Sequence, residues 1–548
     1  MSKIRIFSLG GLNELGKNMY IVEVDEDIFV FDAGLKYAED KMLGVDYIIP
    51  NYDYLKENQN RIKGIFITHG HNEQMGALTD ILVDLPNLPI YATSFTAKII
   101  RQELLNENLD TSNLHEIKSH RKMKVGNSYI FPINLTHSVP ESVGYVLYTN
   151  DGAIFYTGNF VFDPTMIGSY KTDIGKLAYV GKQGVLCLMS ESSYADKPGF
   201  TSPNHRISQV ISETLNRSEG RVLFNVLHAQ LYRIQELFEE VSKTDRNIIV
   251  LGKNLQNILI HAIDAGYVKF DKKRIVSIKH VNDDDIVIIV SDEREKPFSN
   301  LNRIIKGYDK FVKLKESDTI LFASPVFDGN EKTAAKLFDN IARTGANLVN
   351  LPTKKYLSHH ASSEDLMLML DLMQPKYYFP VIGEYRHQVA NAEVAKSIGM
   401  TDENILLKLN GQVVTFENGK LVDTNEIVKT DEILIDGKTV GDIGELVLKD
   451  RESLSDNGIV LITVTLDKET KKVLAGPEIM TRGFIYVKDN IDLIKEAEKL
   501  SLEVVKANIK PNYVDFNKIK SGIRDKVGSY FYEETECRPM ILVVMQEV

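Results

Sequence analysis

The sequence predicts a mixed α/β protein built from several domains, and three observations support this prediction. The chain has 548 residues, which is too long for a single hydrophobic core and favours two to four domains. Its composition, 43% apolar and 26% charged, is typical of a globular protein. The pattern of strands and helices changes along the chain and then changes back, which indicates that one domain is inserted into another.

Residues 1–204 are predicted to form the first part of a β-rich layered domain. Short alternating strands such as KIRIFSL, MYIVEV and IFVFDAG are separated by Gly and Asn, and a helix expected over 96–106 lies outside them. Residues 353–430 return to this texture, with a helix over 363–373 that leads into a strand over 376–381. The two segments are therefore expected to complete one domain.

The segment between them, residues 205–352, alternates strands with helices. RVLFNVL, AQLYRIQELFEEVSK and NIIVLG follow one another as strand, helix and strand, which is typical of βαβ units around a parallel sheet. A charged linker is expected over 431–457. Residues 458–548, with a strand, an amphipathic helix and a final strand, are predicted to form a small α+β domain.

Composition limits the location and the partners. No apolar run approaches the ~20 residues that cross a bilayer, and the N-terminus leads into a strand rather than a leader peptide. Only Cys187 and Cys537 are present, so we expect a reducing cytoplasm and no membrane partner. A nucleic-acid binder with a net charge of −11 must concentrate positive charge locally. The basic clusters are each interpreted as solvated surface: 121–124, 272–274, and Lys306, Lys310, Lys313 and Lys315.

A candidate metal site follows the predicted strand over 65–68. His69 and His71, two residues apart, can bind one divalent ion, and the end of a rigid strand is where binding residues are presented. His137 ends another predicted strand, and Asn159 follows a Thr-Gly turn at the next strand end. Structural histidines, hydrogen-bonded in a polar pocket, are the alternative interpretation.

Eight segments, in order, make the chain resemble the ribonuclease J family, bacterial ribonucleases with a metallo-β-lactamase fold and a β-CASP insertion. They are GGLNELGKN, THSVPESVG, YTGNFVFDPT, MSESSYADKPGF, ASPVFDGNE, LSHHASSEDL, VIGEYRH and GPEIMTRGFIYVKD. The resemblance spans nearly the whole chain. It implies an αββα metallo-β-lactamase sandwich, an inserted β-CASP α/β domain and a small C-terminal α+β domain.

The resemblance also implies two metal ions, Zn²⁺ or Mn²⁺, which activate a water and polarise the scissile phosphate. The first ion would be bound by His69, His71 and His137, all of which are present. At most one ion is expected here, Zn²⁺ or Mn²⁺, with a protein that binds no ion as the alternative.

The second ion loses most of its ligands. Glu73 and Gln74 stand where the family has Asp and His, and Asn159 replaces the carboxylate that bridges the two ions. Ile382 stands at the position of a further histidine ligand. Glu73 and Asn159 therefore remain as weak candidate ligands, whereas Gln74 and Ile382 are lost ligand positions.

RNA binding in the family uses two turns. The first corresponds to residues 227–233, where Gln230 and Arg233 are candidate RNA-binding residues. The second is Tyr356-Leu357-Ser358-His359-His360, in which His359 replaces a close-approach glycine. His360 keeps the position that contacts phosphate or donates a proton. Residues 291–297 lose two glycines and gain carboxylates that would repel RNA. The catalytic set is therefore expected to be degenerate, with Glu73 and His360 remaining.

The resemblance implies a degenerate member of the family, similar to the second paralogue that some bacteria carry beside an active one. Its expected role is an RNA-binding partner subunit of the active paralogue, or a homodimer, in 5′→3′ exonucleolytic and endonucleolytic processing for mRNA decay and rRNA maturation. Two alternatives stay open. One is a weakly active Mn- or Zn-dependent ribonuclease, and the other is a scaffold that does not touch RNA.

Overall fold

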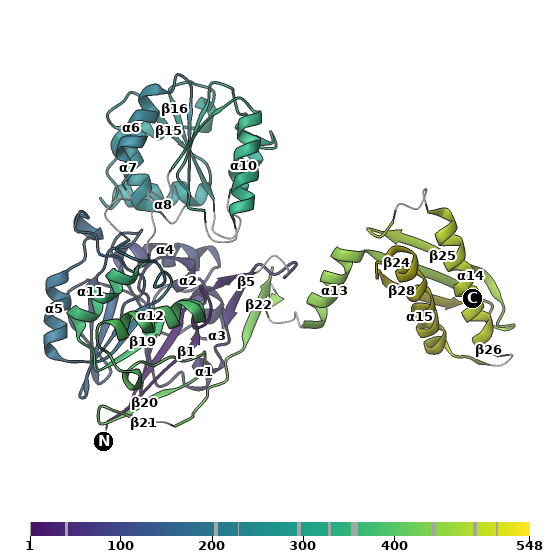
Figure 1. The fold of residues 1–548 in the computed structure, drawn as a ribbon, viewed down its shortest axis with the longest axis horizontal. Helices are drawn as coiled ribbons and strands as arrows, with labels where there is room; N and C mark the ends of the chain where they lie inside the picture. Colours follow the sequence, from purple (N-terminus) through teal and green to yellow (C-terminus); the bar gives the residue numbers. More distant parts are fainter. Residues whose placement is uncertain are drawn as a thin grey trace. The chain divides into compact units, whose positions relative to one another are not determined.

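The computed structural model confirms the predicted mixed α/β fold (Figure 1). It describes residues 2–38, 42–201, 206–227, 230–292, 298–326, 330–351, 360–422, 424–437, 439–440, 445–485, 490–510 and 513–548. The chain divides into two compact units, Met1–Tyr37 with Ile48–Ile433, and Ala38–Tyr47 with Leu434–Val548. Among the helices so described, none is long and apolar enough to span a membrane.

The first large sheet of unit 1 contains strands from both ends of the unit. β20 (Val414–Glu417) pairs antiparallel with β1 (Lys3–Gly10), so residues after the insertion complete the sheet that the N-terminus begins. In spatial order the eight strands are β21 (Lys420–Val422), β20, β1, β2 (Met19–Val24), β3 (Asp27–Phe31), β6 (Ile62–Phe66), β7 (Ile90–Thr93) and β8 (Leu114–Ile117).

The second sheet also joins strands from before and after the insertion. β13 (Val185–Glu191) and β19 (Tyr377–Val381) are parallel neighbours, with Cys187 opposite Tyr377. The six strands lie in the order β19, β13, β12 (Gly152–Tyr156), β11 (Val143–Thr149), β10 (Ser128–Asn134) and β9 (Met123–Val125). The inserted segment therefore leaves and returns at adjacent strands.

One apolar core lies between these two sheets. Phe29 and Phe31 from the first sheet pack in the same buried cluster as Tyr145, Leu147 and Ile154 from the second. Helices cover the outer faces (Figure 1): α2 (Asn72–Met75), α3 (Leu78–Asp84) and α4 (Ser94–Asn106) follow strands of the first sheet, and α5 (Ile174–Gln183), α11 (Ser363–Met373) and α12 (Tyr385–Ser397) pack on the second. Helix α1 (Asp53–Glu57) instead follows β5 (Tyr47–Pro50), a strand of a separate four-stranded sheet. The layers are thus helix, sheet, sheet, helix, as the resemblance implied.

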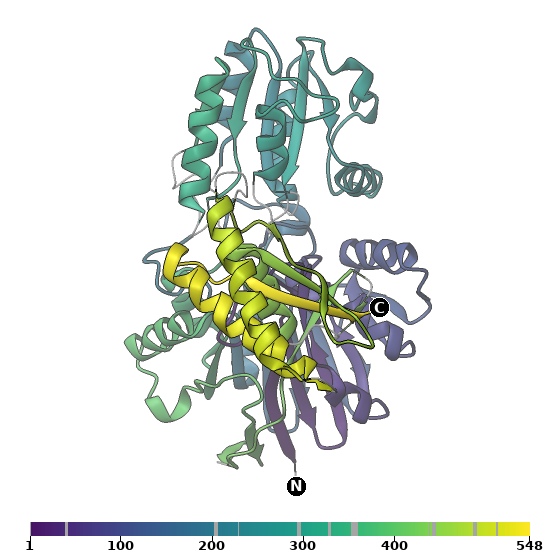
Figure 2. The ribbon, with the colours of Figure 1, turned by 90° about the vertical axis from the view of Figure 1, so that its right-hand side faces the viewer.

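The inserted segment folds around a five-stranded sheet in which every pair of neighbours is parallel. Its order is β15 (Asn247–Val250), β16 (Ile286–Asp292), β14 (Val222–Leu227), β17 (Thr319–Phe322) and β18 (Asn347–Asn350). Helices lie on both faces (Figure 2), because alternate strand residues pack with α6 (Ser208–Arg217), α7 (Leu231–Val241) and α8 (Lys253–Asp264) on one side, and with α9 (Ser299–Ile305) and α10 (Glu331–Arg343) on the other.

Unit 2 contains a three-stranded sheet with two helices on one face. The strands lie in the order β25 (Val473–Arg482), β24 (Ile459–Leu466) and β28 (Met540–Glu547), and β24 and β28 are parallel. Alternate residues of β24, such as Val460 and Ile462, are buried against α14 (Ile491–Asn508) and α15 (Phe516–Thr535). The predicted linker over 431–457 includes helix α13 (Glu445–Asn457); its boundaries stay a prediction.

Candidate metal centre

Three predicted ligands come from two strand ends. His69 and His71 follow β6, and His71 is the residue before α2, so the chain turns sharply between strand and helix there. His137 follows β10 in the facing sheet. His69 and His137 are almost completely buried, whereas His71 is half-buried. The turn after β6 in the first sheet and the end of β10 in the second sheet therefore bring the three imidazoles together.

The three histidines present nitrogen atoms that lie within 4.8 Å of one another. His69 Nε2 lies 3.2 Å from His71 Nδ1, and His137 Nε2 lies 3.4 Å from the same atom. His71 Nε2 lies 3.1 Å from the hydroxyl of Ser138. Three-histidine clusters of this kind bind Zn²⁺-like ions, so the residues present fit one ion.

A buried hydrogen-bond chain orients His69. Its Nδ1 lies 2.9 Å from Thr68 Oγ1, and that hydroxyl donates to Asp32 at 3.0 Å. Asp32 also accepts from the backbone N–H of Thr68 and from the hydroxyl of Tyr156. Burial raises the pKa of Asp32 to about 7, although the hydrogen bonds from Thr68 and Tyr156 act to lower it. When Nδ1 carries the hydrogen, Nε2 offers its lone pair to the cluster, which is the tautomer that a metal ligand needs.

The positions of the second ion offer little to a cation. Gln74 is fully buried, and neither its Oε1 nor its Nε2 has a hydrogen-bond partner among the residues that the structure describes. Asn159 is buried as well, and its Oδ1 has no partner within the same described set. Glu73 lies in α2 and is half-buried. In the described part of the chain, its carboxylate does not belong to the group formed by the three histidines.

Ile382 is buried in the apolar core between the sheets. Its φ of 53° lies in the left-handed region, which costs a β-branched residue ~1–2 kcal/mol. Hydrogen bonds hold it there, because its N–H donates to Tyr20 Oη at 3.0 Å and its C=O accepts from the N–H of Ser192 at 2.9 Å. This position therefore keeps an unusual backbone shape without a metal-binding side chain.

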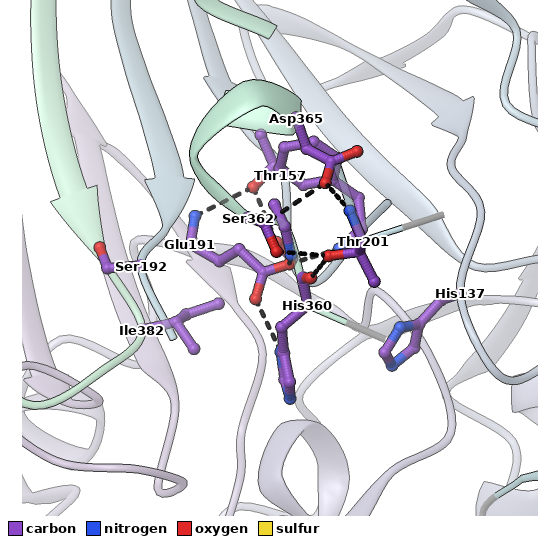
Figure 3. Close-up of polar contacts among 12 residues, drawn as sticks. His137, Thr157, Glu191, Ser192, Thr201, His360, Ser362, Asp365 and Ile382 are labelled. Carbon is purple, nitrogen blue, oxygen red and sulfur yellow. Dashed lines mark hydrogen bonds and ion pairs between the residues drawn. The ribbon is translucent and has the colours of Figure 1, made fainter. Parts of the chain in front are cut away.

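A glutamate that the sequence analysis did not single out supports His360. Glu191 ends β13, is fully buried and accepts from His360 Nδ1 at 2.7 Å (Figure 3). Its other oxygen accepts from the backbone N–H groups of Phe160 and Ala361. Burial raises the pKa of Glu191, and its contact with His360 opposes that shift. The signal was a carboxylate at the end of an apolar strand, VLCLMSE, which also applies to Asp32 in IFVFD.

The loop that carries His360 is fixed by a second carboxylate. Asp365 accepts from the backbone N–H groups of Phe162, Thr201 and Ser362, which tie three segments together (Figure 3). Thr201 also donates its hydroxyl to the C=O of His360 at 2.6 Å. The ring centroid of His360 lies 6.3 Å from that of His137. His360 is thus held beside the histidine cluster, with its Nε2 pointing away from Glu191.

The other predicted RNA-binding residues differ in their placement. Arg233 is fully buried and forms an ion pair with Glu236 at 2.6 Å, so it would have to leave that pair to reach a phosphate. Gln230 is buried at the start of α7. The predicted residues Tyr356, Leu357, Ser358 and His359 lie outside the described residues, as do 228–229 and 293–297. The RNA-binding assignments stay predictions.

Comparisons with family models match four parts of the chain. Residues 29–174 match the beta-lactamase superfamily domain, and residues 219–341 match the ribonuclease J beta-CASP domain. Residues 352–406 match the Zn-dependent metallo-hydrolase RNA specificity domain, and residues 446–548 match the ribonuclease J C-terminal domain. Along the chain, these matches fall in turn on the first part of the sandwich, the inserted domain, the second part of the sandwich and unit 2.

Full-length relatives are similar throughout. Ribonuclease J2 of Bacillus subtilis (strain 168) is 38% identical over 550 residues, which cover 100% of this chain and 99% of that protein. Ribonuclease J 2 of Staphylococcus aureus (strain NCTC 8325 / PS 47) is 36% identical over 549 residues, with 100% and 98% covered. A crystal structure of a protein of unknown function from Enterococcus faecalis V583 has a TM-score of 0.52 at 13% identity, covers 76% of this chain and 100% of that chain, and bears on the fold alone.

Proposed function

This chain belongs to the ribonuclease J family, and we propose that it acts as an RNA-binding partner subunit with little or no catalytic turnover of its own. Its processes would be those of the family, 5′→3′ exonucleolytic and endonucleolytic RNA processing in mRNA decay and rRNA maturation. A cytoplasmic location is part of the same proposal. The observation that carries it is the contrast within one centre, where three histidines converge but only Glu73 keeps a carboxylate among the remaining ligand positions. The other positions hold a neutral amide, at Gln74 and Asn159, or an apolar side chain, at Ile382.

At most one ion, Zn²⁺ or Mn²⁺, would be held by His69, His71 and His137. When bound, such an ion supplies a Lewis acid that polarises a phosphate oxygen. The clamp that a second ion provides on the attacking or leaving oxygen has no replacement at Gln74 or Ile382. Losing one preorganised electrostatic contact typically costs ~10²–10³ in rate, so the expected turnover is small.

RNA would be held beside this centre by the chain's own groups. The Glu191 carboxylate fixes the orientation of His360 and leaves its Nε2 to contact a phosphate oxygen. A ring with a hydrogen on each nitrogen would donate from Nδ1 to Glu191 and from Nε2 to a phosphodiester, and such charge-assisted hydrogen bonds are among the stronger contacts available to a phosphodiester. This arrangement supports RNA retention without cleavage.

Two measurements on the purified full-length protein test the proposal. Elemental analysis should give at most one Zn²⁺ or Mn²⁺ per chain, and a 5′-monophosphorylated RNA should bind without rapid cleavage. The quadruple variant Glu73→Asp, Gln74→His, Asn159→Asp and Ile382→His should bind a second ion, whereas Glu73→Asp alone should not. Two ions per chain and rapid cleavage by the unaltered protein would refute the proposal.

A partner is expected to be the active paralogue or a second copy of this chain. The face of the unit 2 sheet opposite α14 and α15 supports this, because Leu542 and Val544 of β28 are 45% and 48% exposed there. Leu542→Lys with Val544→Lys should reduce the mass of the complex in light scattering. Tyr532→Lys, on α15, is the control on the helical side.

A weakly active ribonuclease is the alternative function, and the intact histidine cluster together with the Glu191–His360 pair favours it. Slow cleavage that requires Mn²⁺ and disappears in His71→Ala would support this alternative. Cleavage that persists in His71→Ala would point to a contaminating nuclease.

A further inference from the structure

Two aromatic side chains are exposed on the inserted domain. Tyr308 is 78% exposed and Phe311 is 54% exposed, and both lie on the loop between α9 and β17. Rings of this size that stay in water do not contribute the favourable free energy of burying apolar surface in a core. Folding of the domain therefore does not account for their position.

The loop that carries these rings is anchored at its first half. Asp309 is buried and accepts from the backbone N–H groups of Phe311 and Val312, both at 2.9 Å. Val312 is fully buried in the core of the domain. The N–H of Tyr308 donates to the C=O of Arg303 at 2.9 Å, so the loop backbone is attached to the last turn of α9. The two rings are thus displayed by a fixed backbone.

The second half of the loop is anchored by a buried ion pair. The guanidinium of Arg221 bonds both oxygens of Asp318 and also donates to the C=O of Lys313 at 2.7 Å. Asp318 in turn accepts from the N–H of Lys315 at 2.7 Å. The first half of the loop is therefore joined to α9, and the second half to the residues that precede β14 and β17.

Two lysines lie next to the rings in the sequence. Lys306 and Lys310 are exposed, and Lys310 Nζ lies 5.4 Å from the centroid of the Phe311 ring. Asp309 is buried and pairs with Arg303 at 3.0 Å, which balances its charge. This local excess of lysine contrasts with the chain's net charge of −11.

We propose that this surface, made of Tyr308, Phe311, Lys306 and Lys310, binds single-stranded RNA by stacking bases on the two rings while the lysines contact phosphates. Exposed aromatic rings among cations are the combination that single-stranded nucleic acids require, because every base has a π-face and every linkage a negative charge. The inference rests on the proposed RNA-binding function and adds a second contact surface to it.

This surface lies at the end of the sheet away from the histidine centre. The loop precedes β17, so it lies at the amino ends of the parallel strands. At the carboxyl ends, after β14, the N–H of Tyr232 donates to the C=O of Ser138 at 3.2 Å, beside His137. RNA contact at this surface is therefore independent of contact at the histidine centre.

The chain contains no tryptophan, which allows a direct test in the full-length protein. Tyr308→Trp keeps a stacking ring and introduces a single indole fluorophore, and Tyr179→Trp, at a 55% exposed position on α5, is the matched control. The probe is an oligouridine of about 10 nucleotides with a 5′-hydroxyl, a length within the site sizes known for stacking surfaces. RNA should quench the indole fluorescence of the Tyr308→Trp variant and leave that of the Tyr179→Trp variant unchanged.

Affinity measured by anisotropy provides the second readout. Tyr308→Ala and Phe311→Ala should each weaken binding about 5- to 150-fold, as loss of one base–ring stack does, whereas Tyr179→Ala should not. His360→Ala separates this surface from the centre. If His360→Ala weakens binding and the two loop variants do not, the further inference is wrong and the proposed function stands.

Two other outcomes would also overturn the inference. The fluorescence of the Tyr308→Trp variant could respond to a purified family paralogue but not to RNA, in which case the surface binds protein. The unaltered chain could bind no RNA at all, in which case both the inference and the proposed function fail.

Discussion

The hydroxyl of Thr68 is expected to control metal affinity without touching the ion. Thr68→Val keeps the shape of the side chain but removes the link from His69 Nδ1 to Asp32, at 2.9 and 3.0 Å. The imidazole can then adopt the tautomer that presents N–H instead of a lone pair. Loss of such a supporting hydrogen bond typically lowers metal affinity ~10–100-fold, or about 1.4–2.7 kcal/mol.

The structure also indicates that the variant will fold. Asp32 keeps the N–H of residue 68 at 2.8 Å and the hydroxyl of Tyr156 at 2.7 Å, so its buried carboxyl retains donors. The loss of the two hydrogen bonds of the Thr68 hydroxyl should lower the free energy of unfolding by about 1–3 kcal/mol. Thermal melting of the metal-free protein measures this loss separately from the loss of metal affinity.

Titration calorimetry with Zn²⁺ on metal-free protein measures the affinity, and Thr136→Val is the matched control. Thr136 precedes His137 as Thr68 precedes His69 and is equally buried, but its hydroxyl donates to the C=O of Tyr170 at 2.7 Å. Equal Zn²⁺ affinity of wild type and Thr68→Val, or an equal loss in Thr136→Val, would refute the reasoning.

Three further predictions concern single residues. Burial raises the pKa of Asp32 from 3.8 to about 7, so between these pH values the folded chain holds a proton that the unfolded chain releases. The contribution of Asp32 to the free energy of unfolding should therefore fall by about 1.4 kcal/mol per pH unit between about pH 4 and 7 and stay constant above pH 7. Melting curves of Asp32→Asn should lack this pH dependence. His360→Ala should weaken RNA binding about 10- to 150-fold, the loss of one charge-assisted hydrogen bond, while elemental analysis shows unchanged metal content. Asp318→Ala strands the buried Arg221 and should lower the free energy of unfolding by about 3–5 kcal/mol, whereas Asp339→Ala, at an exposed pair, should change it by less than about 1 kcal/mol in calorimetry.

The fold class and the grouping of three histidines could be predicted from the sequence. The strands and the His69–His71 spacing are local signals, and the family resemblance added His137 to the group. Alternating apolar residues indicate the strands, and His69 and His71 directly follow one of them. The family resemblance then supplied the layers, which the two facing sheets confirm.

What escaped prediction depends on long-range contacts. Glu191 and His360 are 169 positions apart in the sequence, so no local sequence pattern indicates that they form a pair. Arg233 belongs to a segment that corresponds to an RNA-binding turn of the family, and the structure places it in α7, buried beside Glu236; no sequence pattern indicates this burial, and its RNA-binding role stays a prediction. The left-handed backbone of Ile382 is likewise invisible in a sequence, because Ile favours extended conformations.

The contact between Thr201 and His360 has a consequence for how this protein could be dissected. Thr201 lies before the inserted domain and donates its hydroxyl to the C=O of His360, after it, at 2.6 Å, so the chain leaves and re-enters the sandwich at almost the same place. Excising that domain and bridging the gap with a short turn would leave every strand of the sandwich with its partner. We therefore expect the sandwich to fold without its insert once Phe95 and Val139, which pack against the insert, are replaced by polar residues.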